Sequence, residues 1–171
     1  MPVPKKLINF LEKSKVKYQI IEHKTVYTAY DKVQTLKVPE KMVGKTLVFK
    51  TDPEGKPSAS YGASGKLAVV LIPENKNLDK EKIKKLLKAK KVELVSERLI
   101  KNKFKGVKVG AVPPFGNLWG LGTFADKSLI NQPKLIVNGG DYNFSIKISS
   151  VSFKKLIPEL VIGSFSKAKS R

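Results

Sequence analysis

The chain has 171 residues and carries 34 lysines and arginines against 14 acidic residues, a formal charge of +20. This length predicts one domain that can bury a sizeable core without covalent staples. Because cysteine is absent, disulfides, thiol nucleophiles and cysteine-containing zinc sites are excluded. His23 is the only histidine, which excludes a cluster of histidine ligands, so we expect no metal and no cofactor.

The excess of positive charge favours a polyanionic partner, with nucleic acid ahead of an anionic membrane surface. Arg98 and Arg171 are the only arginines, so nearly all of this charge comes from lysine. Lysine suits phosphate groups, whereas arginine is the usual reader of guanine edges in duplex DNA. The composition therefore predicts docking on a nucleic-acid backbone. The alternative is lysine enrichment through genome composition or heat adaptation, and the latter usually raises glutamate as well.

Neither a secretory signal nor a membrane span is expected. No apolar segment follows the charged start of the chain, Met1–Lys6. The longest strongly apolar run, Leu67–Ile72, is far too short to cross a bilayer. We therefore expect a cytoplasmic protein without a membrane partner.

Helices and strands are predicted to follow one another without regular alternation, which is typical of an α+β fold with a mixed sheet. In chain order we expect a helix over 4–14, a strand over 17–23, a short helix after the capping residues 28–31, strands over 45–50 and 66–72, a helix over 77–91, a strand over 92–95, a helix from 96 towards 103, strands over 122–125 and 134–138, a hairpin turn over 138–141, a strand over 142–148 and a helix over 150–156. No structure is predicted for 57–65. We expect one domain over 1–163 and a disordered basic tail over 164–171.

Lys45 is the first candidate functional residue. In a strand, residues two apart share a face, so Lys45 lies on the same side as Val43, Leu47 and Phe49. A lysine on an apolar face must extend to solvent, pair with an acid or project into a cleft. Partial burial would lower its pKa. The alternative is one more solvated lysine among many.

The second candidate is the loop of Gly110, Ala111, Val112, Pro113, Pro114, Phe115 and Gly116. Proline fixes φ and glycine permits positive φ, so this composition predicts a rigid loop with accessible backbone groups. Such groups can bind an amine or donate to an oxyanion. The alternative is an ordinary structural loop.

Three weaker candidates lie elsewhere. The segment Asn138, Gly139 and Gly140 is either a simple hairpin turn or the rim of a pocket. His23 follows an apolar pair and is more often structural than catalytic in such a place. Asp126 ends a predicted strand, which favours a cap or turn, with a role as the acid partner of Lys45 as the alternative.

These motifs, taken in order, resemble the YbaK/prolyl-tRNA synthetase-associated domain family, the trans-editing aminoacyl-tRNA deacylases. The resemblance covers residues 7–156 and rests on the segments 21–23, 43–48, 78–79, 110–116, 126–129 and 137–140. It implies an α+β fold around a mixed, barrel-like sheet with flanking helices. It also implies hydrolysis of the ester between a mischarged amino acid and tRNA. Lys45 takes the position of the family's essential lysine, and Gly110–Pro114 that of its Gly-x-x-x-Pro loop.

Two departures bear on the substrate. The cysteine-specific members carry a tyrosine where Ile21 stands here, and an acid near Phe144 or Ser145. The resemblance therefore favours alanine or another small residue over cysteine as the amino acid removed.

The resulting hypothesis is a deacylase that binds the acceptor end of tRNA, with an aminoacyl-tRNA synthetase as a further candidate partner. In this hypothesis Lys45 holds the terminal adenosine or polarises the ester carbonyl. The loop backbone binds the amino acid, and water or a substrate group attacks. One alternative is a non-catalytic module that binds tRNA or a synthetase. The other is a nucleic-acid-binding protein driven by charge alone.

Overall fold

The computed structural model describes residues 3–27, 29–51 and 67–169. The predicted capping residue Thr28 and the stretch 57–65 lie outside the described residues. The first half contains α1 (Lys5–Lys13), β1 (Tyr18–Glu22), α2 (Ala29–Leu36), η1 (Glu40–Met42), β2 (Gly44–Thr51), β3 (Leu67–Pro73), β4 (Lys76–Leu78) and α3 (Lys80–Leu87). The second half contains β5 (Val92–Leu94), α4 (Glu97–Lys103), η3 (Gly116–Trp119), β6 (Gly122–Asp126), α5 (Lys127–Ile130), β7 (Lys134–Asp141), β8 (Phe144–Ser149), α6 (Ser150–Leu156), β9 (Val161–Gly163) and β10 (Ser166–Ala168).

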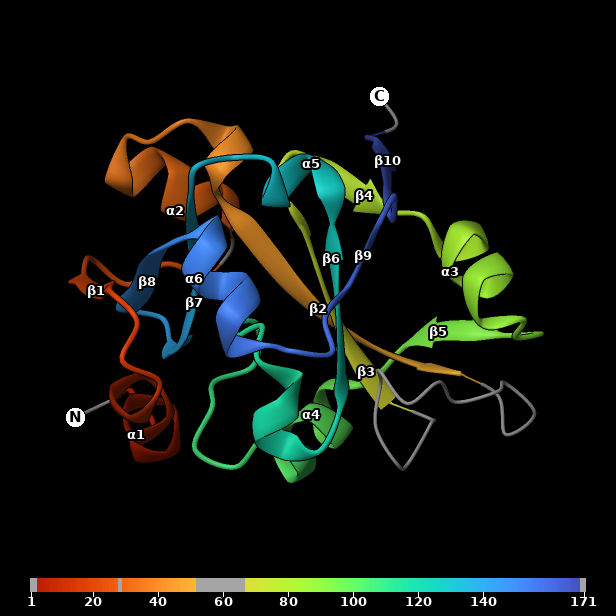
Figure 1. Ribbon diagram of the computed structural model, residues 1–171, viewed down its shortest axis with the longest axis horizontal. Coiled ribbons are helices and arrows are strands. Elements are labelled where there is room, and N and C mark those ends of the chain that lie inside the picture. The colour runs from red at the N-terminus through yellow and green to blue at the C-terminus, as the bar shows by residue number, and fades with distance from the viewer. Residues whose placement is uncertain (1–2, 28, 52–66, 170–171) are drawn as a thin grey trace.

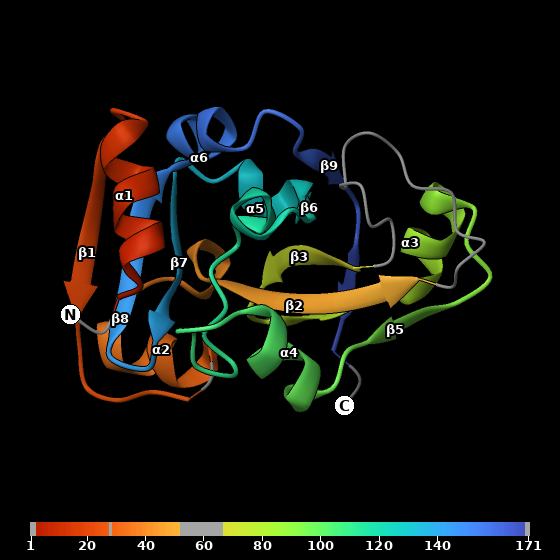
Figure 2. The ribbon, with the colours of Figure 1, turned by 90° about the horizontal axis from the view of Figure 1, so that it is seen from below.

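The strands form a mixed arrangement, which confirms the predicted α+β class. One sheet has the order β5-β2-β3-β6-β9, in which β6 runs parallel to both of its neighbours. A second, antiparallel sheet has the order β1-β8-β7. A parallel bridge between Val43 and Ile136 joins β7 to the start of β2, so the two sheets meet along the edge of β7. Figure 2 shows β1, β8 and β7 to one side of β2 and β3.

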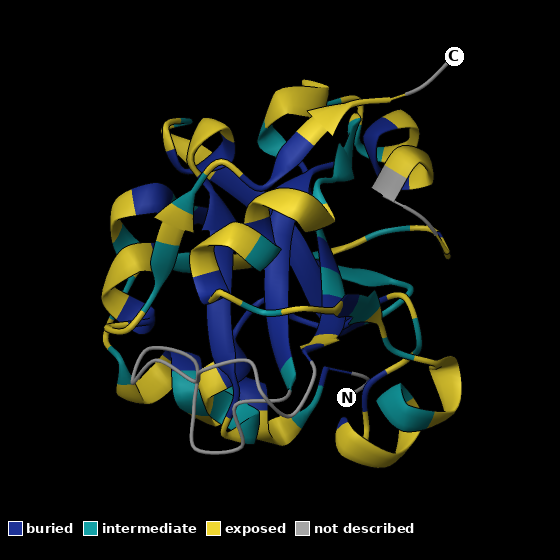
Figure 3. Cartoon of the chain, turned by 90° about the vertical axis from the view of Figure 1, so that its right-hand side faces the viewer, coloured by how far each residue is buried: buried dark blue, intermediate teal, exposed yellow. Residues whose placement is uncertain are grey.

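The strands β3 and β7 are buried along both of their faces, so helices pack on both sides of the sheets. Leu135 and Val137 of β7 pack with Leu7 of α1 and Phe153 of α6. On another face, α3 covers the central strands (Figure 1) through a cluster centred on Phe124. Figure 3 shows the central strands buried and the outer faces of the helices exposed. Among the described residues, no helix is long and apolar enough to cross a membrane.

Two predictions that concern the contact between β4 and β10 are wrong. The tail expected to be disordered from residue 164 forms β10, which pairs antiparallel with β4. Phe165 is 3% exposed, and its ring lies 5.6 Å from that of Phe124. The helix expected from residue 77 begins at Lys80, because 76–78 form β4 and Asp79 caps the helix by accepting from the amide of Lys82. Pairing between two polar segments far apart in the chain therefore overrides local pattern.

Candidate functional site

The edge of β7 that faces away from β8 is contacted at two places. At Ile136 it bridges to Val43, just before β2. Further along, the amide of Lys108 donates to the carbonyl of Gly140, and the amide of Gly140 donates to the carbonyl of Ala111, both at 2.9 Å. The start of β2 and the predicted 110–116 loop therefore share one strand edge, and Asn138 lies between their contacts.

Asn138 ties this loop to helix α2. It is buried, and its Nδ2 donates to the carbonyl oxygen of Val112 at 3.2 Å. Its Oδ1 accepts from Nζ of Lys32 on α2 at 2.7 Å. One amide side chain therefore holds a loop carbonyl and a lysine amine at the same time. This use of both ends fixes the orientation of the side chain.

The hairpin predicted over 138–141 is placed differently. Gly139 and Gly140 belong to β7, and the register shifts between Asn138 and Asp141. The turn follows it, where the amide of Asn143 donates to Oδ1 of Asp141. Gly140 has a φ of 90°, and a Cβ there would lie 2.7 Å from Cδ of Pro4. Glycine is needed at 140 because this irregular strand end runs close to other chain segments.

Lys32 is a buried residue that the sequence analysis missed. It is 4% exposed, and its recorded hydrogen bond within the described chain is to the neutral amide of Asn138. Burial lowers the pKa of Lys32 to about 8. A signal was available, since Lys32 and Leu36 are four residues apart and share a helix face.

His23 joins the same region through Ser145. In the β1-β8-β7 sheet, Ser145 is the cross-strand partner of both Asn138 and Ile21. Cross-strand partners point to the same face, so Ser145 and Asn138 lie side by side. Ser145 is fully buried, and its Oγ lies 2.8 Å from Nε2 of His23. We call the four residues Lys32, Asn138, Ser145 and His23 the polar row.

Lys45 lies beside this row on the neighbouring strand. Val43 and Ile136 form a parallel bridge, and Lys45 and Asn138 each lie two residues further along, so they share a face. The side chain of Lys45 is half-buried. Burial, and then the charge of Lys169, lower its pKa, and the nearby carboxylate of Glu74 opposes this. Its charged neighbours therefore belong to the end of β3 and the C-terminal strand, not to the loop.

The predicted loop is anchored at both ends. Gly110 is exposed with a φ of 86°, and residues 111–116 are buried. The amide of Gly116 donates to Oγ1 of Thr123, and a Cβ at Gly116 would lie 2.7 Å from the carbonyl oxygen of Gly122. Phe115 stacks against Phe153 at 5.7 Å. Backbone contacts and core packing therefore hold Pro113 and Pro114 in place.

Asp126 is a helix cap whose carboxylate is fully engaged. Oδ1 accepts from the amide and hydroxyl of Ser128, and Oδ2 accepts from the amide of Phe165 and the hydroxyl of Ser166. Burial alone would raise the pKa of Asp126, but these hydrogen bonds outweigh it and lower the pKa. This geometry agrees with the cap interpretation and gives no support to a pairing with Lys45.

A hollow of about 490 Å³ opens beside Gly110. The rings of Tyr27 and Tyr142 lie 4.8 Å apart in its wall, and the Tyr142 hydroxyl donates to the carbonyl of Val109 at 2.6 Å. Glu97, Lys101 and Lys108 also line it. The exposed end of the loop therefore faces a space of ligand size that combines aromatic side chains with charged side chains of both signs.

Comparison with known proteins identifies the family. The model of the aminoacyl-tRNA editing domain matches residues 23–156, a span that holds the whole polar row, Lys45 and the loop. The chain belongs to the aminoacyl-tRNA editing domain family.

Solved structures share the fold of this editing domain. The hypothetical protein APE2540 matches with a TM-score of 0.78 at 20% identity, over 95% of this chain and 100% of the other. A candidate trans-editing enzyme for prolyl-tRNA synthetase matches with a TM-score of 0.74 at 17% identity, over 98% and 99%. A candidate signal transduction protein from Marinobacter aquaeolei VT8 matches over 95% of this chain but 30% of its own, with a TM-score of 0.68 and 14% identity. At these identities the likeness shows the fold alone.

Proposed function

We propose that this editing domain hydrolyses the ester of a mischarged aminoacyl-tRNA, releasing a small amino acid such as alanine, with cysteine less favoured. The observation that carries the proposal is the position of Asn138, which holds the Val112 carbonyl of the loop beside the start of β2. The two motifs that the family resemblance assigns to catalysis thus flank one strand edge. The family match supports an editing role for them.

The loop has the backbone geometry to bind the aminoacyl group. The carbonyls of Ala111 and Val112 are occupied by Gly140 and Asn138, which holds the peptide planes of the loop in one orientation. The exposed end at Gly110 faces the hollow beside Tyr27 and Tyr142. In this proposal, loop backbone groups bind the α-amine or the developing oxyanion, because preorganised dipoles stabilise charge without reorganising.

Lys45 supplies the positive charge. It binds the phosphate or ribose of the terminal adenosine, or polarises the ester carbonyl. Water attacks the carbonyl carbon, the bond to the ribose oxygen breaks, and that oxygen takes up a proton. The products are a free amino acid and an uncharged tRNA. An aminoacyl ester is already activated, so positioning and charge suffice and no thiol or metal is required.

The preference for a small, uncharged side chain follows the two departures noted in the sequence. Ser145 stands in the segment where the cysteine-specific members carry an acid, and it is fully buried against His23. Ile21 is its cross-strand partner. The polar row of this chain thus offers neither that carboxylate nor that tyrosine.

A panel of mischarged tRNAs tests the proposal. The wild-type protein should release amino acid from at least one member, and Lys45→Ala should lower that rate at least a hundredfold while leaving the free energy of unfolding within about 1 kcal/mol. The matched control is Lys50→Ala, an exposed lysine of the same strand.

Two outcomes would contradict it. Turnover by Lys45→Ala at the wild-type rate would remove the assigned role of the lysine. Tight tRNA binding by the wild type without turnover on any member of the panel would favour the non-catalytic module instead.

A further inference from the structure

The face of the β1-β8-β7 sheet that carries the polar row continues beyond it. Side chains two residues apart on a strand share a face, so Lys147 lies on the same face as Ser145 of β8. Gln19 and Ile136 are its cross-strand partners on β1 and β7. Lys134 lies opposite Ser149 at the next position. Next to the polar row, this sheet face therefore carries basic side chains.

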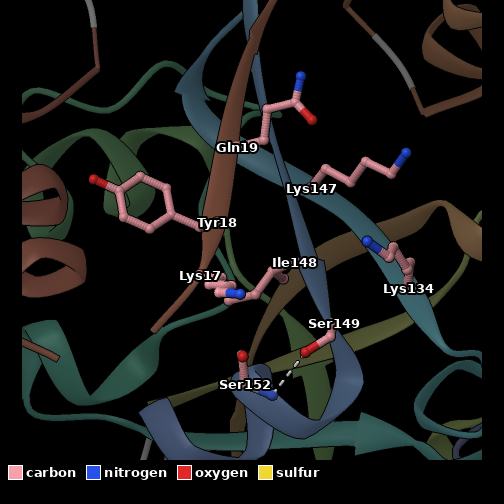
Figure 4. A pocket seen from close by; sticks show the side chains of 8 residues that line it. All are labelled: Lys17, Tyr18, Gln19, Lys134, Lys147, Ile148, Ser149 and Ser152. Atoms are coloured by element: carbon pink, nitrogen blue, oxygen red, sulfur yellow. Dashed lines mark hydrogen bonds between the residues drawn. The ribbon is translucent and has the colours of Figure 1, made fainter. Parts of the chain in front are cut away.

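A hollow of about 340 Å³ lies over this basic part of the sheet (Figure 4). Its lining includes three lysines in or next to the β1-β8-β7 sheet, namely Lys17, Lys134 and Lys147. No acidic side chain lines it, and none of the three lysines makes an ion pair with a residue that the structure describes. Figure 4 shows Lys134 and Lys147 on neighbouring strands, with the amine of Lys147 drawn to the right and that of Lys134 to the left.

Uncharged donors accompany these lysines. Gln19 and Ser152 line the hollow and carry an amide and a hydroxyl. The Oγ of Ser149 accepts from the amide of Ser152 at 3.1 Å, which leaves its hydroxyl hydrogen available to donate outward. Lysine amines next to hydroxyl and amide donors suit phosphate and ribose oxygens.

This hollow, which we call the groove, lies on the same sheet face as the polar row but is separated from it by buried residues. Lys147 is two residues from Ser145, a step of about 7 Å, and Lys134 is four residues from Asn138, about 13 Å along β7. Between them, Ile136 is buried against Val33 and Val43, and Ser145 and Asn138 are buried as well. The lysines therefore lie close to the candidate site along the strands, without an open path to it across this sheet face.

We propose that the groove of Lys17, Lys134 and Lys147 binds the phosphate backbone of the acceptor strand of tRNA. This inference rests on the proposed function for the identity of the RNA. The three cations of this surface have no acidic partner among the described residues, and they lie on the sheet face that carries the polar row.

The test compares two variants of equal charge. The groove variant is K17Q/K134Q/K147Q, and the control is K80Q/K82Q/K85Q, three lysines of α3 on another side of the fold. Glutamine keeps a long polar side chain and a similar helix propensity. The probe is an uncharged RNA hairpin with an acceptor stem and a single-stranded 3′ end, and its dissociation constant is measured by fluorescence anisotropy over a range of salt concentrations.

We expect the groove variant to weaken binding at least tenfold at low salt and to lower the slope of log K against log[salt] by about 2, because up to three phosphate contacts are lost at ~0.7–0.9 each. The control should weaken binding less than threefold. Equal losses in the two variants, or an unchanged slope in the groove variant, would overturn the inference. Because the probe carries no amino acid, this result is independent of whether the wild type proves to be a deacylase.

A duplex DNA of the same length, without an overhang, serves as competitor. It should displace the hairpin poorly from the wild type. Displacement as efficient as that by unlabelled hairpin would show that charge alone drives binding, and would also overturn the assignment of the groove to an acceptor strand.

Discussion

Asp126 and Lys32 are both buried charged side chains, and the protein surrounds them differently. The carboxylate of Asp126 accepts hydrogen bonds from Ser128, Phe165 and Ser166, which occupy both of its oxygens. The amine of Lys32 has a neutral amide, Asn138, as its recorded partner in the described part of the chain. The pKa of each moves accordingly, since hydrogen bonds lower that of Asp126 despite burial, and burial lowers that of Lys32 to about 8.

Because of this difference, the charge of Asp126 stabilises the fold, whereas the charge of Lys32 lowers the free energy of unfolding. A buried anion with a full set of donors stabilises the elements that supply them, here the start of α5 and the C-terminal segment. A buried cation with one neutral partner costs stability. Costly groups of this kind concentrate at functional sites. Lys32 belongs to the polar row through its hydrogen bond to Asn138, whereas Asp126 caps a helix.

The largest expected effect comes from breaking the Lys32–Asn138 contact from one side. Asn138→Leu should lower the free energy of unfolding by roughly 3–5 kcal/mol, because it leaves a buried cation without its partner. Adding Lys32→Met should recover most of that loss, since both polar groups are then replaced by apolar ones. Urea denaturation of the two single variants and the double variant measures the coupling. An Asn138→Leu cost that is unchanged by Lys32→Met would show that the contact carries no energy.

The second prediction concerns how the free energy of unfolding depends on pH through Lys32. The pKa of Lys32 is about 8 in the folded protein against an ordinary value of 10.5. Between these values the unfolded chain binds more protons, so stability should rise with pH, by on the order of 3 kcal/mol in total. The rise should be present in the wild type and missing in Lys32→Met, as measured by denaturation at pH 7.5, 9 and 10.5. A parallel rise in both proteins would assign it to the other lysines.

Asp126→Asn should have a smaller effect on stability, and in this case the charged form of the side chain stabilises the fold. It removes a charge that accepts hydrogen bonds, and we expect a loss of about 2 kcal/mol at pH 7 with no change in deacylation rate. Because the folded pKa of Asp126 is lowered, this contribution is present at neutral pH and is lost as the pH falls below the ordinary value of 3.8. Asp79→Asn is the control, since asparagine caps helices as well as aspartate does. Equal losses in the two variants would refute the special role of Asp126.

The smallest effect concerns Lys45. Lys169→Gln removes a positive charge that lowers the pKa of Lys45, so that pKa should move back up. An NMR titration of labelled lysine side chains, with the Lys45 signal assigned from Lys45→Arg, measures the shift. Lys167→Gln, two residues earlier on the C-terminal strand, should leave the signal in place. A downward shift in Lys169→Gln would mean that another group controls Lys45.

The sequence was sufficient for elements whose signals are local. The strand beginning near Lys45, the helix capped by Ser96 and the last helix over 150–156 follow from apolar spacing and capping residues. The strand pair β4–β10 could not be predicted, because each partner is short and polar and gains its structure from the other. The turn near Gly139 was misplaced because a register shift extends β7 through both glycines.

The candidate site was predicted in its parts but not in its connections. The sequence pointed to the loop around Pro113 and to Asn138, and the structure links them by a hydrogen bond from Asn138 to Val112. His23 is one of the weaker candidates from the sequence, and it contacts a buried serine on the face of the site. Lys32 was missed because a lysine on a short amphipathic helix is usually solvated, and only tertiary packing buries it.

The pairing of β10 with β4 affects how this protein should be handled in the laboratory. Lys169 forms an ion pair with Glu74 at 3.6 Å, and both groups influence Lys45. A truncation after Gly163, or a purification tag fused directly to the last strand, would disturb the electrostatic surroundings of the lysine proposed to act on the substrate. Recombinant versions intended for activity assays should therefore carry their tag at the amino end, with the carboxyl end left as it is.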